Sequence, residues 1–210
     1  PPLFHRSDAK ASTSLLDQRS ANQWEIGQLI RVGDLKETNQ RILGSLEGGA
    51  NALELQLNTA LTEEELNILL KDVVPAYISL HFSWEAHDFP LMDFWKSLQG
   101  YFAGKNEAKS WKGSLQWMPT LAADKLQEAA QMMQSITSAS VHLFQVKTKT
   151  AANSNLAEDL AQLVGQAQAL ITHLQGVGVT AETSAPRIQF ALSTNSTFFG
   201  EIARIRALRV

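Results

Sequence analysis

Cysteine is absent from this chain of 210 residues. Its absence excludes a disulfide scaffold, a thiol nucleophile, and zinc or iron–sulfur sites built on cysteine ligands. A surplus of one charge is also lacking, because 18 Lys and Arg residues stand against 21 Asp and Glu residues, for a net charge of −3. This balance does not favour binding to nucleic acid or to a membrane surface. No apolar run of about 18 residues occurs, so the sequence predicts no membrane-spanning helix.

Common cofactor and catalytic motifs are missing as well. The chain has no G-x-G-x-x-G or G-x-x-x-x-G-K-[ST] loop for phosphate groups, no G-x-S-x-G turn and no H-E-x-x-H motif. It begins without Met and without a basic-then-apolar signal, so we expect a cytoplasmic protein trimmed at its start. Residues 1–23 are polar and irregular and predict an extended N-terminal arm. Residues 24–210 are expected to form one domain with one core.

The chain does contain a strand–helix pattern that repeats about six times. Asp34 with Glu37, and Thr62 with Glu65, have the spacing of capping boxes at helix starts. Strict alternation of strands and helices predicts an α/β fold whose parallel strands are joined by helical crossovers. The predicted strands are 24–32, 52–58, 77–83, 113–118, 140–147 and 187–193. The predicted helices are 34–48, 62–72, 91–102, 122–136, 155–175 and one that ends the chain.

Most predicted strands alternate apolar and polar residues. A central strand of a doubly wound sheet is apolar on both faces, whereas these strands have one apolar face. The residues expected to be buried against helices are Leu53, Leu55, Leu57, Ile78, Leu80, Leu115, Ile188 and Phe190. The polar residues of the opposite face are Glu54, Gln56, His81, Gln116 and Gln189.

Two architectures accommodate such a polar face. In a one-sided open sheet it would face solvent. In a TIM-type (β/α)8 barrel it would line the interior, where each unpartnered polar group costs about 1–3 kcal/mol. We predict the barrel, here an incomplete or truncated barrel of about six strand–helix units. The five polar residues would then point to a common axis and be joined by hydrogen bonds or water.

Two stretches resemble the methylmalonyl-CoA mutase family, in particular the barrel domain of its small subunit. "WEIGQLI…TNQRILGSLEGGANALELQLN" is similar to the family's first strand, its Asn-x-Arg helix, a Gly-Ala turn and the second strand. "APRIQFALSTNSTFFGEIARIRALRV" is similar to a strand followed by a phenylalanine-rich helix. Between them, Gln116 stands where the family's fourth strand usually carries Gln, and "AANSNLAEDLAQLV" resembles the helix after the fifth strand. The resemblance covers about residues 24–210.

The resemblance implies a subunit of the adenosylcobalamin-dependent enzyme that interconverts methylmalonyl-CoA and succinyl-CoA. Active family members carry Arg and Tyr on the first strand, where this chain has Gly27 and Leu29. They end the fifth strand in Gly-Tyr-His, where this chain has Val146, Lys147 and Thr148. The family's Asp-x-His-x-x-Gly cobalamin motif does not occur in these 210 residues. The resemblance therefore implies a non-catalytic small subunit without cofactor or metal sites, in a heterodimer whose large subunit carries the cobalamin.

Two further expectations follow from the resemblance, and three follow from the residues themselves. The five polar positions would be vestiges of a barrel interior that threads coenzyme A, and the family barrel would continue past Val210, which makes this chain a fragment. Open sheet edges predict that the isolated chain associates with itself or with a large subunit. The last helix's arginines, Arg204 among them, are expected on a solvated or subunit-contacting face. An independent barrel enzyme using Glu85, Asp88 or His81 at the strand ends stays open as the alternative.

Overall fold

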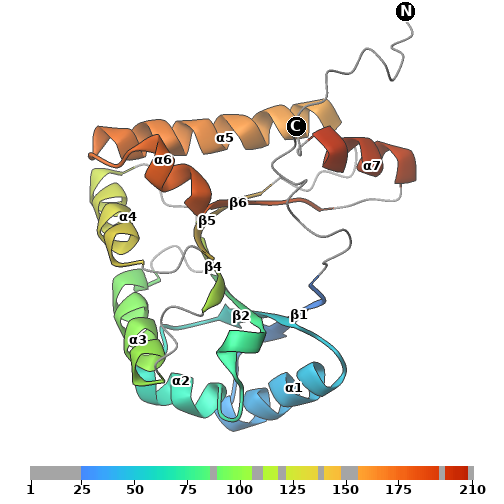
Figure 1. Cartoon of the computed structure of the whole chain (residues 1–210), viewed down its shortest axis with the longest axis vertical. Coiled ribbons are helices and arrows are strands. Elements are labelled where there is room, and N and C mark those ends of the chain that lie inside the picture. Colours follow the sequence, from blue (N-terminus) through green and yellow to red (C-terminus); the bar gives the residue numbers. More distant parts are fainter. Residues whose placement is uncertain are drawn as a thin grey trace, which may run out of the picture.

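The computed structural model describes residues 25–85, 89–105, 111–117, 122–136, 140–147, 156–193 and 197–207. Strands and helices alternate along the chain, as the sequence predicts (Figure 1). The strands are β1 (Gly27–Arg31), β2 (Ala52–Leu57), β3 (Ser79–Trp84), β4 (Lys112–Trp117), β5 (Val141–Lys147) and β6 (Ile188–Ala191). The helices are α1 (Leu35–Glu47), α2 (Glu63–Leu69), α3 (Leu91–Gly104), α4 (Ala123–Ser135), α5 (Leu156–Gly176), α6 (Ala181–Ser184) and α7 (Phe198–Ala207), with 3-10 helices η2 (Pro75–Tyr77) and η3 (Ala185–Arg187). The predicted arm 1–23 lies outside the described ranges.

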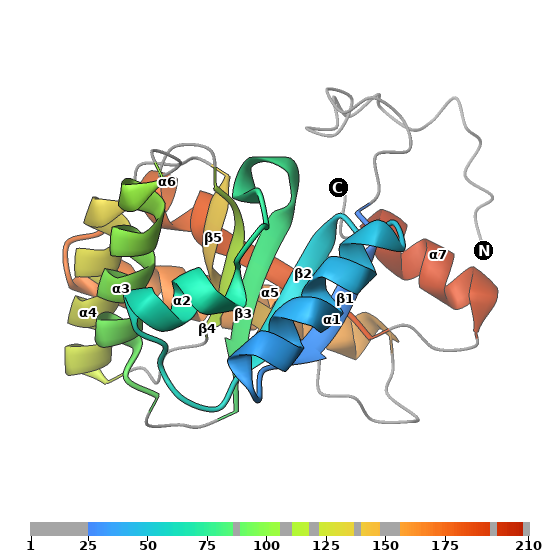
Figure 2. The same ribbon diagram turned by 90° about the horizontal axis from the view of Figure 1, so that it is seen from below.

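All six strands form one parallel sheet in the order β1-β2-β3-β4-β5-β6. Each strand pairs with the strand before it in sequence, which is the order of a singly wound sheet and not of a doubly wound one. Figures 1 and 2 show helices α1 to α5 in an arc on one side of the strands. The predicted α/β class with a parallel sheet is confirmed. Within the described ranges β1 pairs only with β2 and β6 only with β5, so the sheet is open between β1 and β6.

Side-chain caps start the first two helices. The Asp34 carboxylate accepts hydrogen bonds from the backbone N–H groups of Lys36 and Glu37, at 3.0 and 2.9 Å. Before α2, the Thr62 hydroxyl accepts from the Glu65 N–H, and the Glu65 carboxylate accepts from the Thr62 N–H. The predicted capping box is therefore confirmed for α2, whereas α1 begins on the Asp34 cap. Both caps fix the point at which the chain leaves the sheet and enters a crossover helix.

The apolar strand face packs on the helices, with one exception. Ile78 and Ile188 are half-buried at the margin of the core. The prediction for Phe190 is wrong, because its side chain is 45% exposed. Its strand β6 has a neighbouring strand on one side only in the described sheet, and α7 packs against α5. The predicted positions that the structure confirms as buried are Leu53, Leu55, Leu57, Leu80 and Leu115.

Close packing joins the start of β4 to β3. The Trp111 ring stacks on Phe102 with ring centroids 4.9 Å apart, and its indole N–H donates to the Leu80 backbone carbonyl at 3.3 Å. Two residues later, Gly113 has φ +144°, a conformation that residues with a Cβ rarely adopt. A Cβ at Gly113 would lie 1.7 Å from the Leu80 carbonyl oxygen. Glycine is therefore required at this contact between the two backbones.

Candidate functional site

The five polar residues predicted to share a face are all half-buried and alternate with helix-facing residues. Strand register places Glu54 beside His81, His81 beside Ser114, and Ser114 beside His142, in one row across β2 to β5. We call the sheet surface opposite the helices the inner face. Polar residues of the described strands on this face include Arg31, Glu54, Gln56, Ser79, His81, Ser83, Ser114, Gln116, His142, Gln145 and Gln189.

One hydrogen-bonded group of the inner face centres on Ser114. The Ser114 hydroxyl oxygen lies 2.8 Å from Nδ1 of His81, and it accepts a hydrogen bond from Nε2 of Gln189, also at 2.8 Å. Ser114 is completely buried. Strand β5 lies between β4 and β6, which places these two strands about 9–10 Å apart in the hydrogen-bonding direction. The bond from Gln189 to Ser114 therefore bridges two strands that do not pair. Two predicted residues, His81 and Gln189, are thus brought together by a third.

A second group links β1, β2 and the end of β3. The Arg31 guanidinium donates from Nε to the Gln56 side-chain carbonyl at 2.9 Å, and the Gln56 amide donates to the Glu85 carboxylate at 2.9 Å. The Ser83 hydroxyl donates to the Glu54 carboxylate at 3.1 Å, between β3 and β2. Glu54 and Gln56 therefore bond to partners other than the predicted residues.

The sequence prediction missed Ser114, although the signal was present. Ser114 alternates with Gly113 and Leu115 on β4, so its position in the strand assigns it to the same face as His81. The neighbour of Gln116 on β5 could not be predicted from strand alternation, because the pairing of β4 with β5 shifts between Ser114 and Trp117. Gln116 lies inside that shift and outside the aligned row of polar residues.

Burial lowers the pKa of His81 below the ordinary histidine value of 6.5. The carboxylates of Glu25 and Glu54 act in the opposite direction, and His142 adds to the lowering. Removal from water dominates because the charged imidazolium loses more hydration than the neutral ring. His81 is therefore neutral at pH 7, and one of its ring nitrogens is available to accept a hydrogen bond.

This depressed pKa predicts a pH dependence of folding. The folded chain binds a proton at His81 less readily than the unfolded chain, so this contribution to stability is complete above pH 6.5 and is lost as the pH falls through the folded pKa. In urea unfolding at a series of pH values from 8 to 5, we expect His81→Gln to lose less stability on acidification than the unaltered chain. Parallel pH profiles for the two proteins would contradict the assignment.

The residues of the alternative enzyme do not converge. His81 lies on β3 and Glu85 directly follows that strand, four residues later, which corresponds to about 13 Å along an extended chain. The Glu85 carboxylate already accepts from Gln56. Asp88 lies outside the described ranges. In the part of the chain that is described, no group of three or more His, Cys, Asp or Glu side chains could hold a metal ion.

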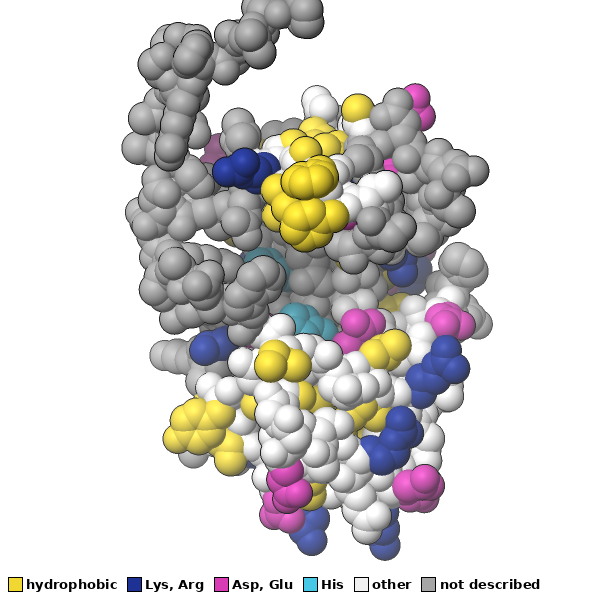
Figure 3. Space-filling view, turned by 90° about the vertical axis from the view of Figure 1, so that its right-hand side faces the viewer, with side chains coloured by type: hydrophobic (Ala, Val, Ile, Leu, Met, Phe, Trp, Pro, Cys, Tyr) yellow, Lys and Arg dark blue, Asp and Glu magenta, His cyan; other side chains and the backbone are white. Residues whose placement is uncertain are grey.

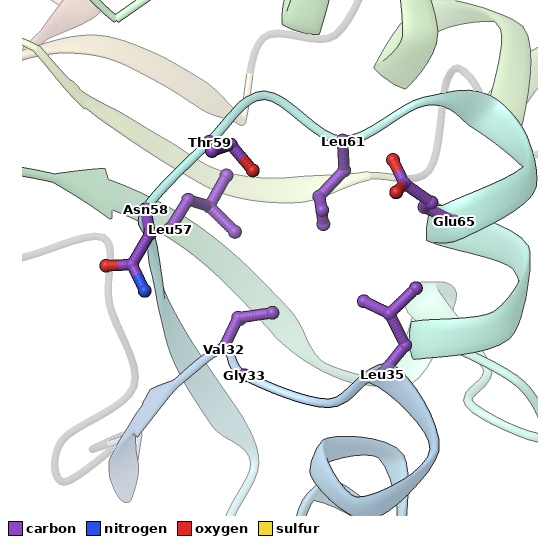
Figure 4. A pocket seen from close by; sticks show the side chains of 8 residues that line it. All are labelled: Val32, Gly33, Leu35, Leu57, Asn58, Thr59, Leu61 and Glu65. Carbon is purple, nitrogen blue, oxygen red and sulfur yellow. The ribbon is translucent and has the colours of Figure 1, made fainter.

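A pocket of about 230 Å³ lies where β1 and β2 end and α1 and α2 begin (Figure 4). This edge of a parallel sheet is where α/β proteins commonly bind ligands. Its apolar side chains are those of Val32, Leu35, Leu57 and Leu61, and the carboxylate of Glu65 is engaged in the α2 capping box. The pocket therefore offers little chemistry. It is lined by Val32, Gly33, Leu35, Leu57, Asn58, Thr59, Leu61 and Glu65.

A family model described as methylmalonyl-CoA mutase matches residues 106–210, the half of the chain that contains β4 to α7. The chain belongs to the methylmalonyl-CoA mutase family. It is also 29% identical over 234 residues to a protein of Porphyromonas gingivalis (strain ATCC BAA-308 / W83) named methylmalonyl-CoA mutase small subunit. That alignment covers 99% of this chain and 37% of the relative, so the chain spans little more than a third of the relative's length. The family resemblance predicted from the sequence is confirmed.

Four of the five positions compared with the family's catalytic residues lie on β1 and β5, and Thr148 lies outside the described ranges. Gly27 and Leu29 lie on β1, and Leu29 is 50% exposed beside Glu54 in the register of β2. Val146 is buried against α5, and Lys147 ends β5 with an exposed side chain. Among the described helices, none is long and apolar enough to cross a membrane.

Proposed function

We propose that this chain is part of a small, non-catalytic subunit of adenosylcobalamin-dependent methylmalonyl-CoA mutase. It supports a large catalytic subunit that interconverts methylmalonyl-CoA and succinyl-CoA, in a cytoplasmic heterodimer. The proposal rests on family membership together with the side chains at the positions where active family members carry catalytic residues. Gly27 and Leu29 offer no hydrogen-bonding side chain on β1, and Val146 packs away from the inner face.

We further propose that the open sheet is part of a (β/α)8-type barrel whose interior is the inner face. Three features support this: the sequential strand order, the helices on one side, and the Gln189–Ser114 bond across β5. Glu54, Gln56, His81, Gln116 and Gln189 are then the remains of an interior that accommodated a polar ligand. Hydrogen bonds of Glu54, Gln56, His81 and Gln189 with neighbouring residues now satisfy groups that a ligand would otherwise engage.

The residues of this chain do not fit a cobalamin site. The family's Asp-x-His-x-x-Gly motif does not occur among the 210 residues. Neither inner-face histidine has the motif's Asp two residues earlier, because Ser79 precedes His81 and Ser140 precedes His142 at that spacing. We therefore assign the adenosylcobalamin to the large subunit and derive no catalytic step from this chain.

The isolated chain is expected to show no mutase activity and no tight cobalamin binding. The reason is that it lacks the Asp-x-His-x-x-Gly cobalamin motif. It also lacks the family's Arg and Tyr on the first strand and the Gly-Tyr-His run at the end of the fifth. The purified chain should be assayed with methylmalonyl-CoA and adenosylcobalamin, alone and with a large catalytic subunit, and titrated with cobalamin by ultraviolet–visible spectroscopy.

Three results would overturn different parts of the proposal. A stoichiometric cobalamin spectrum with the chain alone would contradict the assignment of the cofactor to the large subunit. Turnover by the chain alone, abolished by His81→Ala or Glu85→Ala, would favour the independent barrel enzyme. Absence of any complex with the large subunit in analytical ultracentrifugation would remove the supporting role.

A further inference from the structure

Helix α7 turns charged side chains inward and large apolar side chains outward. Glu201 and Arg204 are only 6% and 4% exposed, so the expectation of a solvated or subunit-contacting Arg204 is wrong. A surface helix normally shows the reverse arrangement. In Figure 3, hydrophobic side chains gather on the upper part of the face where Figure 1 places α7. The exposed fractions along the helix are 69% for Phe198, 84% for Phe199, 40% for Ile202 and 40% for Ile205.

The buried Arg204 connects three parts of the fold. Its guanidinium lies 2.6 Å from the Glu201 carboxylate, one turn earlier in α7, and 3.6 Å from the Asp159 carboxylate on α5. It also donates to the backbone carbonyl of Ser193, beyond the end of β6. Asp159 is 7% exposed, so all three charged groups are removed from water. Buried charges are tolerated when they are paired and hydrogen-bonded, and the planar guanidinium can serve several acceptors at once.

The two faces of α7 differ by a rotation about the helix axis. Successive residues of a helix are turned by about 100°, so Phe198, Ile202 and Ile205 fall on one stripe. Glu201 falls about 70° and Arg204 about 130° from the middle of that stripe, on the same side of it, which averages about a quarter of a turn. A rotation of that size would bring the apolar stripe toward α5 and remove it from water. The hydrophobic effect favours this rotated helix, so another interaction must oppose it.

We propose that Arg204, Glu201 and Asp159 form an orientation lock that sets the rotation of α7 and holds its apolar stripe outward. In the observed rotation the guanidinium meets both carboxylates and the Ser193 carbonyl. In the rotated helix Arg204 moves away from Asp159, which stays buried on α5 with its charge uncompensated by Arg204. Breaking a buried pair in this way is strongly unfavourable. The lock therefore acts by making the rotated helix unfavourable. As a result the stripe of Phe198, Ile202 and Ile205 stays exposed, although packing of apolar surface alone would bury it.

A thiol reporter can measure the rotation, since the chain has no cysteine of its own. Ile202→Cys places one thiol on the outward stripe. Its reaction rate with a thiol reagent is compared in the otherwise unaltered chain and in a chain that also carries Arg204→Met, Glu201→Gln and Asp159→Asn. This triple change removes every charge of the lock at once. We expect the thiol to react several-fold more slowly in the triple variant, with helix content by circular dichroism unchanged.

Two control variants separate the lock from general effects of charge. Arg206→Met removes an exposed arginine from the same helix and should leave the thiol's rate unaltered. Arg204→Lys keeps the charge and should keep the rate close to that of the unaltered chain. An equal rate in the triple variant with intact helices would overturn the proposal. So would faster labelling with loss of helix content, because the cluster would then hold α7 folded and not set its rotation.

Discussion

Replacing Gly113 with Ala is expected to destabilise the chain by about 3–5 kcal/mol, or to prevent folding. Gly113 has φ +144°, and the added methyl group would lie 1.7 Å from the Leu80 carbonyl oxygen and 2.5 Å from its carbon. Both atoms belong to the backbone of β3, so relief requires the separation of two paired strands. Urea unfolding followed by tryptophan fluorescence measures the loss, because Trp111 lies at the same junction.

Gly165→Ala is the matched control for this substitution. Gly165 lies in α5, and a Cβ there would have no heavy atom within 4 Å, its own helix backbone aside. Alanine should therefore stabilise the chain by about 0.5–1 kcal/mol through helix propensity. Similar losses at the two positions would mean that the contact between Gly113 and Leu80 is not what makes glycine necessary on β4.

Leu55→Ala is expected to cost about 2–5 kcal/mol. The Leu55 side chain is fully buried on β2, which is flanked by β1 and β3, and its removal leaves a cavity under the helices that the neighbouring strands cannot close. The midpoint of urea unfolding should fall accordingly, with an unchanged slope.

Leu29→Ala tests the same chemical change on the neighbouring strand and the other face. Leu29 pairs with Glu54, whereas Leu55 pairs with Ile30, and Leu29 is 50% exposed. Its truncation should change the stability by no more than about 0.5 kcal/mol. A large loss at Leu29 together with a small loss at Leu55 would reverse the assignment of the two strand faces.

Much of the sheet could be predicted from the sequence because side chains alternate with a period of two along a strand. In β2 the alternation of leucine with Glu54 and Gln56 is uninterrupted, and the structure buries the leucines as predicted. Within the candidate site, the sequence was sufficient to predict that His81 lies on the polar face of its strand. The link from His81 to Gln189 through the Ser114 hydroxyl was not predictable, because it joins β4 to β6, two strands that do not pair.

The remaining errors have physical causes that local patterns do not contain. Phe190 is as apolar as the buried residues, but a strand with one neighbour cannot cover it. Arg204 has the sequence signature of a surface residue. Its burial follows from an acidic residue on α5, 45 positions earlier, which no spacing rule within α7 reveals.

The sequential order of the sheet has a consequence for the chain during its synthesis. A parallel strand needs its partner before it can be stabilised, and in many α/β sheets that partner is synthesised later. Here the partner of each strand from β2 to β6 precedes it, one crossover earlier. A chain that emerges from the ribosome N-terminus first can therefore add one strand–helix unit at a time to a sheet already formed. At each stage the growing edge moves to the newest strand while the outer edge of β1 in the described sheet stays open, so a chaperone that protects nascent chains would need to cover both edges.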